Sequence, residues 1–278
     1  ISSSSRLINN ASFSTRPPHV SELFSEGLHH STGSIEEGIL YEDGDWDTNE
    51  KLLMETSYKW SSTYQLEKNN LAMEVSAYAN LLKNFVSLQP TDTRLTIRGY
   101  FPVFQFVQTD AVLSGADMSI RWIVHKNLTY TAKGSYLYVQ DVTNEDRLVY
   151  MPPAQMEHAF SFHFDWKNMH ETFLTLRVPT FFKQTRAPRT LFPKDVATDT
   201  SDKNFDFMPP PNGDTLVHLE AGTSIPFDKH TLVFSIAAEN IFNEAYRNYM
   251  NRLRYFADDI GFNLSIRLAY KFHTHAKQ

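Results

Sequence analysis

Apolar and polar residues alternate with a period of two along most of the chain. The clearest stretch lies near the C-terminus, where every second residue is apolar: Phe262, Leu264, Ile266, Leu268, Tyr270 and Phe272. Successive side chains of a strand point to opposite faces of a sheet, whereas a helix would scatter this apolar set around its circumference. The same pattern returns in residues 158–166 and 174–178. The sequence therefore predicts amphipathic strands.

The pattern predicts ten strands, which we place at about residues 6–15, 51–65, 70–89, 102–125, 127–142, 157–167, 170–183, 214–225, 230–239 and 260–272. Their connections alternate in length. Four are short turns, near residues 67–69, 126, 168–169 and 226–229, and five are longer, near residues 16–50, 90–101, 143–156, 184–213 and 240–259. Outer-membrane β-barrels show this alternation, with tight turns on one side of the membrane and long loops on the other. Soluble β-sandwiches do not.

The first long connection contains one stretch that is not strand-like. In residues 17–24, two prolines precede a polar run. Proline is favoured at the first position of a helix because its missing N–H group would be unsatisfied there anyway. We expect a short helical turn inside this loop.

Aromatic residues reach 14% of the chain, with 21 Phe and 13 Tyr against 10 Gly. This density favours strands, and several predicted strands exceed the roughly 9–11 residues that a tilted strand needs to cross a bilayer. Some aromatic residues near strand ends suit the interfacial girdles of a barrel: Trp46, Trp60, Trp122, Trp166, Tyr270 and Phe272. The alternative is that the tryptophans fill the core of a soluble β-protein.

Composition excludes several classes of protein. The chain has no Cys, so it has no disulfide scaffold, zinc ribbon or thiol nucleophile. Its 26 basic and 32 acidic residues give a net charge of -6, which argues against nucleic-acid binding. No apolar run approaches the roughly 20 residues of a transmembrane helix. Because the chain opens on Ile1 and a run of serines, without Met or a signal peptide, we expect a mature product or a fragment.

Three stretches carry recognisable motifs. Residues 13–27 contain Arg-x-Pro followed by Glu-Leu and Gly, and residues 34–38 (Ser-Ile-Glu-Glu-Gly) continue that motif. Residues 101–115 form an aromatic strand that ends in Gly. Residues 238–247 contain Asn-Ile-Phe-Asn before a Tyr, and the run 249–259 continues this motif. All three resemble motifs of the TonB-dependent outer-membrane receptors and follow the family's order, and the resemblance covers nearly the whole chain.

The resemblance implies an all-β fold, an antiparallel transmembrane β-barrel. The family has an N-terminal plug domain and a 22-stranded barrel, so residues 1–278 are expected to be the C-terminal portion, about the last ten strands. Both open edges of such a portion would expose backbone groups that lipid cannot satisfy. We therefore expect the chain to be stable only beside the missing plug and strands. Tyr270 and Phe272 resemble the barrel-assembly signal of outer-membrane proteins.

The resemblance also implies a function. It is energy-coupled uptake of a scarce nutrient across the outer membrane of a Gram-negative bacterium. The nutrient would be an iron complex, either a siderophore or haem, or a metal ion. The implied partners are outer-membrane lipid, the plug domain and N-terminal strands, a TonB-type energy-coupling complex, the barrel-assembly machinery and the small-molecule or metal ligand. No nucleic acid, cofactor or enzymatic chemistry is expected.

The first long loop concentrates candidate ligand-binding residues: His29, His30, Glu36 and Glu37. Imidazole and carboxylate groups are ligands for divalent metals, so His29 and His30 are candidate metal ligands. The alternative is a solvated acidic loop. Adjacent residues of an extended segment point to opposite sides, so two neighbouring His side chains rarely reach one ion.

The last long loop interleaves arginine with tyrosine. Its candidate ligand-binding residues are Tyr246, Arg247, Arg252 and Arg254. Arginine forks suit carboxylate or catecholate ligands. The alternative is that these arginines pair with Asp258, Asp259 and Glu239 and fix the loop.

Two other classes of protein remain open. One is a ten-stranded outer-membrane protease, whose Asp and His residues would lie at the barrel rim; the loops hold Asp and His but no defensible catalytic arrangement. The other is a soluble ligand-binding β-protein, which would stay in the aqueous phase without detergent.

Overall fold

The computed structural model describes residues 4–42, 44–47, 51–228 and 230–272. Its main sheet contains ten consecutive strands, each antiparallel to the next. They are β1 (Ser5–Arg16), β6 (Glu55–Lys68), β7 (Leu71–Thr96), β8 (Gly99–His125), β9 (Leu128–Asp141), β10 (Gln155–Trp166), β11 (Met169–Phe181), β15 (His218–Phe227), β16 (His230–Glu239) and β17 (Asn263–Phe272). Each predicted strand is present, so the all-β prediction is confirmed.

The two faces of this sheet differ in polarity. Residues opposite each other on neighbouring strands share a face. One row across five strands is apolar: Phe162, Leu174, Ala221, Ile236 and Ile266. The next row, on the other face, is polar or small: Ser161, Thr175, Glu220, Ala237 and Ser265. This alternation is the one expected of a barrel wall with a lipid-facing and a lumen-facing side.

The apolar face is not covered by other described parts of the chain. Phe162 is 45% exposed, Leu174 48% and Ile266 64%. On the polar face, hydroxyl groups bond across strands, as Thr63 does with Ser76 at 2.7 Å and Ser161 with Thr175 at 3.0 Å. A β-sandwich would bury its apolar face against a second sheet, and in the described part of the chain no second sheet packs on this face.

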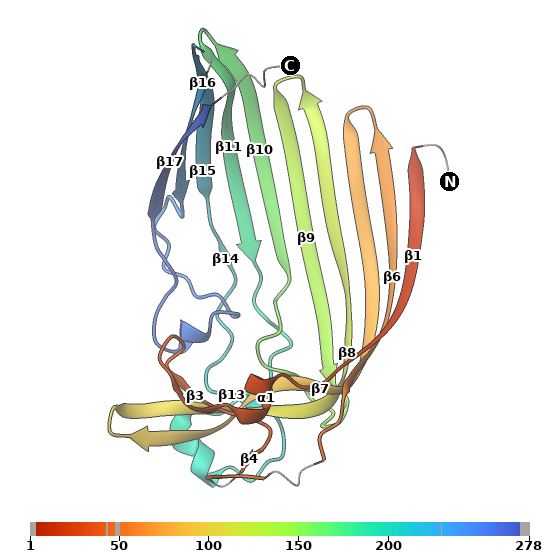
Figure 1. Ribbon diagram of the computed structural model, residues 1–278, viewed down its shortest axis with the longest axis vertical. Coiled ribbons are helices and arrows are strands. Elements are labelled where there is room, and N and C mark those ends of the chain that lie inside the picture. Colours follow the sequence, from red (N-terminus) through yellow and green to blue (C-terminus); the bar gives the residue numbers. More distant parts are fainter. Residues whose placement is uncertain (1–3, 43, 48–50, 229, 273–278) are drawn as a thin grey trace.

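The sheet curves into a wall but does not close (Figure 1). β1 and β17 are the two ends of the strand order, and among the described residues each pairs with only one long strand. The structure is therefore a partial barrel, and the closed ten-stranded barrel of the protease alternative is not formed.

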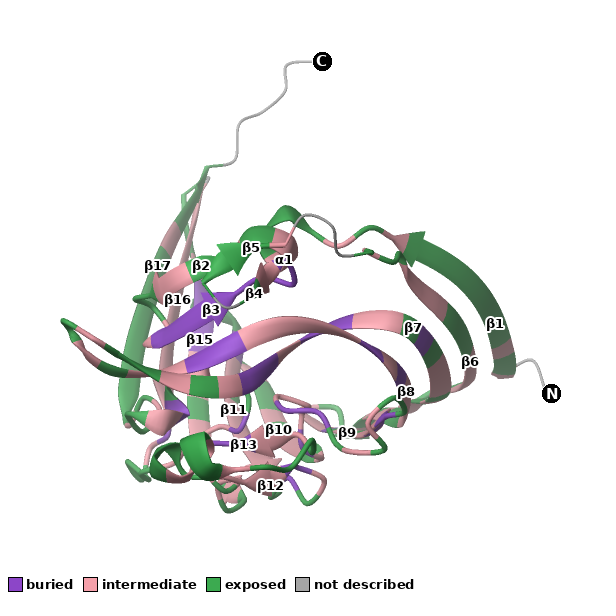
Figure 2. Ribbon diagram, turned by 90° about the horizontal axis from the view of Figure 1, so that it is seen from below, coloured by how far each residue is buried: buried purple, intermediate pink, exposed green. Residues whose placement is uncertain are grey.

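One predicted loop is wrong. Residues 90–101 were expected to be a long connection, but β7 and β8 stay paired up to Thr96 and Gly99 and turn over two residues. A register shift between Pro90 and Asp92 accommodates the irregularity at the proline, and the pairing then continues. We call residues 85–108 the arm. It leaves the wall at its loop end and runs across the mouth of the partial barrel (Figures 1 and 2).

The first long connection packs along the arm. The predicted helical turn is confirmed as α1 (Val20–Phe24), and four short strands follow it: β2 (Glu26–His29), β3 (Ser34–Glu37), β4 (Tyr41–Glu42) and β5 (Asp45–Trp46). β3 adds to the arm as a parallel partner of β8, with Ile35 opposite Val103. These short strands were not predicted because each needs the arm or a neighbouring segment as its partner.

The other long connections contain only short elements. These are β12 (Arg189–Thr190), η1 (Pro193–Thr198), β13 (Phe205–Asp206), β14 (Asp214–Thr215) and η2 (Arg252–Tyr255). No helix within the described ranges is long and apolar enough to cross a membrane.

A small buried core lies at the loop end of the wall. Leu82, Ala111 and Val139 of three neighbouring strands pack with Leu148 from the connection after β9. The connection thus folds against the polar face, and the wall continues into a layer of loops.

Three of the four tryptophans lie exposed on the wall, namely Trp60, Trp122 and Trp166 at 44–60% exposure. They do not fill a core. Trp46 is not at the end of a wall strand as expected; it lies in β5 and packs against Phe24 and Tyr41, with ring centroids 5.7 and 5.0 Å apart.

The open edges generate a prediction. Because β1 and β17 each leave a row of backbone donors and acceptors unpaired, the chain produced alone in detergent is expected to sediment as aggregates or mixed oligomers. The full-length protein is the control and is expected to sediment as one species. A monodisperse monomer of residues 1–278 would contradict this prediction.

Candidate functional site

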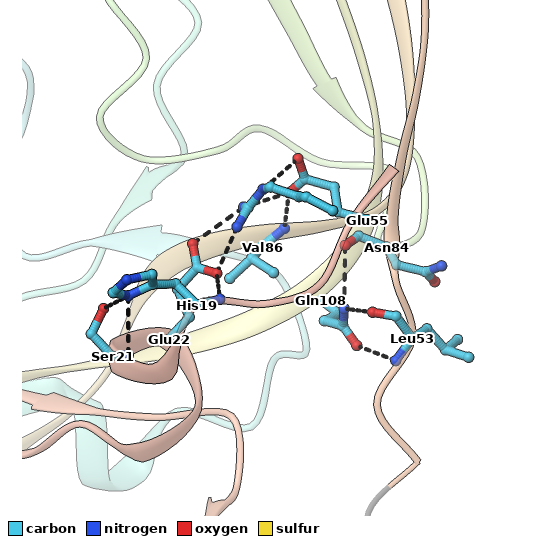
Figure 3. Close-up of polar contacts among 9 residues, drawn as sticks. His19, Ser21, Glu22, Leu53, Glu55, Asn84, Val86 and Gln108 are labelled. Carbon is cyan, nitrogen blue, oxygen red and sulfur yellow. Dashed lines mark hydrogen bonds and ion pairs between the residues drawn. The ribbon is translucent and has the colours of Figure 1, made fainter. Parts of the chain in front are cut away.

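Arg16 joins three segments at the base of the first loop. It ends β1, and its guanidinium reaches Glu22 of α1 at 2.8 Å and Glu55 of β6 at 2.7 Å. A second bond from Nε to Glu55, at 3.0 Å, makes that pair bidentate. Glu55 also accepts from the backbone N–H of Val86 at 3.1 Å, where the arm begins (Figure 3). Arg16 therefore ties the first loop to the arm.

The α1 helix is fixed by a capping box. His19 Nδ1 accepts from the backbone of Ser21, and Glu22 accepts from the backbone N–H of His19 at 2.6 Å (Figure 3). Burial of Glu22 opposes its ionisation, but the hydrogen bonds from Arg16 and His19 prevail and lower its pKa. Gly38 passes so close to this helix that a Cβ there would lie 2.1 Å from the carbonyl oxygen of Leu23. His19, Glu22 and Gly38, which belong to the motifs at residues 13–27 and 34–38, thus fix the position of α1 in the loop.

Side-chain hydrogen bonds stabilise the bend at which the arm leaves the wall. Asn84 has a φ of 53°, and the register shifts between Leu82 and Phe85. The side chain of Gln108 donates to the carbonyl oxygens of Leu53 at 2.7 Å and Asn84 at 3.3 Å (Figure 3). A positive φ is uncommon for residues other than glycine. The bend is therefore a specific backbone conformation that these hydrogen bonds hold in place.

A buried ion pair joins two of the other long loops to each other. Arg254 and Asp206 are 1% and 0% exposed, and their side chains meet at 2.5 Å. Tyr255 donates to the second oxygen of Asp206 at 2.7 Å and accepts from Tyr150 at 3.0 Å. We call Arg254, Asp206, Tyr150, Tyr249 and Tyr255 the buried node. Its members come from three separate connections.

The buried node also stacks aromatic rings on its cation. The Arg254 guanidinium lies 4.4 Å from the ring centroid of Tyr255 and 4.6 Å from that of Tyr249. Phe104 of the arm, which is fully buried, contacts Tyr150 and Tyr255 of the node at 5.8 and 6.1 Å between ring centroids. The arm is therefore part of the same core as the loops.

Burial raises the pKa of the three node tyrosines. It raises the pKa of Tyr150 to about 12, and burial together with the nearby Asp206 carboxylate raises the pKa of Tyr249 and Tyr255. Burial disfavours the charged form of Arg254, but Tyr255 and Asp206 outweigh it and raise its pKa. The node thus holds one cation, one carboxylate and neutral phenols.

The structure separates the candidate histidines of the first loop. His29 Nε2 lies 3.5 Å from Glu36, whereas His30 Nε2 lies 3.1 Å from Arg98 of the arm. Within the part of the chain that is described, no three His, Asp or Glu side chains gather as a metal site would require. The two imidazoles therefore do not converge on one point.

Glu36 and Glu37 are buried and paired with arginines. Glu36 meets Arg252 at 2.5 Å, and Glu37 meets Arg94 of the arm at 2.5 Å. Arg252 also donates to Ser34 at 2.9 Å. Two candidate residues from opposite ends of the sequence, Glu36 and Arg252, are thus brought together.

Arg247 and Tyr246 lie at the surface of the loop layer. Arg247 pairs with Asp258 at 2.6 Å, as the structural alternative expected for the arginines of this loop. Burial and the nearby Asp259 raise the pKa of Tyr246. Arg247 also lines a hollow of about 320 Å³ together with Lys183 and residues 208–212. In the described residues, Lys183 makes no ion pair.

The two asparagines of the Asn-Ile-Phe-Asn stretch stabilise the start of the last loop. Asn240 and Asn243 have φ values of 48° and 53°, a conformation that asparagine tolerates better than most residues. The side chain of Asn240 bonds both backbone groups of Glu244, and Asn243 accepts from the N–H of Phe262 at 2.9 Å. The motif fixes how β16 leads into the loop.

Sequence reasoning missed several residues of the site: Arg16, Glu55, Phe104, Tyr150 and Asp206. Asp206 lies between Phe205 and Phe207 in a proline-rich connection that holds three other aspartates, and an acidic residue in such a long loop looks solvated. Only the excess of aromatic neighbours hinted that this segment is buried.

Comparison with protein families gives a clear result. Residues 7–243 match the family model described as TonB dependent receptor-like, beta-barrel. The match covers most of the chain, so the chain belongs to this family of receptor barrels. Comparison with curated protein sequences finds no match.

Solved structures share the fold at low sequence identity. The chain is similar to the copper transporter OprC, with 14% identity and a TM-score of 0.70 over 98% of this chain and 38% of that one. It is similar to the siderophore receptor PirA of Acinetobacter baumannii, with 12% identity, a TM-score of 0.63 and coverage of 98% and 40%. The ferric preacinetobactin receptor BauA of the same organism gives 12% identity, a TM-score of 0.60 and coverage of 98% and 35%. The chain thus spans less than half the length of these structures.

The buried pair predicts a large effect on the loop layer. Removing one partner of a buried ion pair typically costs about 3–5 kcal/mol. Arg254→Met is therefore expected to speed amide hydrogen exchange in residues 203–208 and 249–256 by roughly two to three orders of magnitude. Hydrogen-exchange mass spectrometry of the full-length protein measures this.

The matched control is Lys83→Met, which removes the half-exposed pair with Asp110. An exposed pair contributes about 0–1 kcal/mol, so this variant is expected to leave those loops unchanged. Equal effects of the two substitutions would contradict a special role of the buried node.

The node tyrosines predict a loss of stability at high pH. Their pKa values are raised above the value of about 10 in the unfolded chain, so the unfolded state loses these protons first. The stabilisation is complete below about pH 10 and is lost as pH rises towards about 12. The denaturant midpoint of the loop layer, followed by tyrosine absorbance, is expected to fall across this range. Tyr150→Phe should reduce the fall, and a midpoint independent of pH would contradict the prediction.

Proposed function

We propose that this chain is the C-terminal part of the barrel of an outer-membrane receptor that takes up a scarce nutrient. The observation that carries the proposal is the ten-stranded open wall, apolar outside and polar inside, in a chain that belongs to the receptor-barrel family. The remaining strands and an N-terminal plug domain would complete the barrel and satisfy both edges. The outer membrane of a Gram-negative bacterium is the site that fits such a wall.

The orientation follows from the loops. Outer-membrane barrels have short periplasmic turns and long extracellular loops. The turns between β10 and β11 and between β15 and β16 would then face the periplasm, where a TonB-type complex acts through the plug. The arm and the loop layer would face the medium and meet the ligand first. Tyr270 and Phe272, at the periplasmic end of β17, would serve the barrel-assembly machinery.

An iron complex is the ligand class that we favour. The similar structures include a siderophore receptor and a ferric preacinetobactin receptor, and one is a copper transporter. The separated histidines give little support to a bare metal ion. The hollow beside Arg247 and Lys183 offers two cations to an anionic chelate. We propose that His29, His30, Tyr246 and Arg247 contact the ligand, and that Glu36, Glu37, Arg252 and Arg254 position the loops beneath them.

A receptor of this kind binds and transports without making or breaking bonds. The family consists of receptor barrels, and the loop layer commits its buried Asp206 and Arg254 to each other. We therefore propose that the protein is not an enzyme.

Growth and binding assays test the proposal. A strain lacking the full-length protein is expected to lose growth on one iron source in a panel of ferric siderophores, haem and copper salts. The purified protein should bind that source. Lys183→Met with Arg247→Met is expected to weaken binding about 10- to 100-fold, the usual effect of losing charge-assisted hydrogen bonds.

Arg6→Met is the matched control, because Arg6 lies on β1 near the turn end, away from the loops. It is expected to leave affinity unchanged. Unaltered growth of the deletion strain on every source, or recovery of the full-length protein in the aqueous phase without detergent, would contradict the proposal.

A further inference from the structure

The end of the arm is apolar and uncovered. We call residues 95–100 the tip. Within it Leu95 is 76% exposed, Tyr100 56%, and Ile97 is fully exposed. The tip has one charged residue, Arg98, and no acidic residue. Exposed apolar groups concentrated at one place mark an interaction site more often than chance.

The arm behind the tip is firmly held. β3 pairs with β8 along residues 103–105, and Arg94 pairs with Glu37 of β3. Phe104 is buried against Tyr150, Phe207 and Tyr255. The pairing with β3 and the buried aromatic contacts therefore end before Leu95. The tip extends beyond them, held by the β7–β8 pairing and by the contact of Arg98 with His30 at 3.1 Å.

The turn itself is ordered. Thr96 Oγ1 accepts from the backbone N–H of Arg98 at 3.1 Å and donates to the carbonyl oxygen of Gly99 at 3.1 Å. Gly99 has a φ of 127°, a conformation open to glycine and rarely to other residues. A defined turn presents Ile97 in one direction.

The tip reaches past the last strand of the wall. In both views the arm crosses the mouth of the partial barrel and its end lies beyond β17 (Figures 1 and 2). Among the described strands, β17 pairs only with β16, so its second edge is open, and the chain covers only 38% of the structure of OprC. In the complete barrel of the proposed function, the strands that adjoin this edge are the first strands of the receptor, and their loops rise beside the tip.

We propose that the tip docks on an extracellular loop of the first barrel strands, and that the arm thereby bridges the two halves of the mouth. The inference rests on the proposed function. The docking surface would offer an apolar patch to Leu95, Ile97 and Tyr100, with a carboxylate or carbonyl oxygens for Arg98. The ligand then enters on either side of a fixed bridge rather than through one open mouth.

Photo-crosslinking in the full-length receptor tests the proposal. A benzophenone amino acid replaces Tyr100 or Ile97, and the membrane fraction is irradiated. The expected result is an intramolecular adduct between the tip and a peptide from the part of the receptor that precedes Ile1. Adducts only with lipid, with another protein or within residues 1–278 would overturn the proposal, and so would no adduct.

Phe160 is the matched control, because it is an exposed aromatic residue on the apolar face of the wall. The same amino acid at Phe160 is expected to label lipid and no upstream peptide, which shows that the chemistry works. If the full-length protein does not fractionate with the outer membrane, the proposed function fails. If it does fractionate there and the tip gives no upstream adduct, only the docking inference fails.

A second measurement does not depend on the label. Ile97→Ser with Leu95→Ser leaves the buried base of the arm intact and removes the apolar contact. Amide exchange in one upstream loop is expected to rise at least tenfold, whereas exchange in residues 101–106 stays unchanged. No change in any upstream loop would contradict the proposal.

Discussion

Antiparallel pairing of β7 with β8 is the constraint on which the rest of the structure depends. It runs from the pair Leu71–Trp122 at the turn end of the wall to the pair Thr96–Gly99 at the end of the arm. Because the same two strands form wall and arm, the loops that pack on the arm are fixed relative to the wall. Arg16 and Glu55 hold the bend from one side, and the buried node holds Phe104 from the other. A pair of charges as deeply buried as Arg254 and Asp206 is a costly way to gain stability; what it supplies here is one defined arrangement of three long connections.

The sequence was sufficient to predict the wall because its alternation is a local signal. Residues 262–272 need no partner to reveal that they form a strand, and the alternating loop lengths indicated a barrel. The arm was missed because Pro90 and Pro102 are read locally as breaks, whereas a register shift beside one of them lets the pairing continue. The strands of the first loop were missed for a related reason, since β3 exists only as a partner of β8.

The candidate site was harder to predict than the fold. Residue type singled out Arg252, Arg254, Glu36 and Glu37 as candidate ligand-binding residues, but it did not show their partners. Glu36 and Arg252, for example, pair although they lie more than two hundred residues apart. Asp206 gave no local sign that it is the partner of Arg254. Adjacent residues on an extended segment were expected to diverge, and His29 and His30 do meet different partners. What a loop residue touches is thus decided by topology.

Because they share strands and buried contacts, the wall, the arm and the loop layer are expected to form one rigid body. Residues 1–278 contain no cysteine, so cysteines introduced at chosen sites in this part of the protein can carry nitroxide labels. Pulsed dipolar spectroscopy between labels at Ile97 on the tip and Leu174 on the wall measures their separation in the full-length protein. The account predicts a single narrow distance distribution. A broad or two-peaked distribution would show that the arm moves relative to the wall and would contradict it.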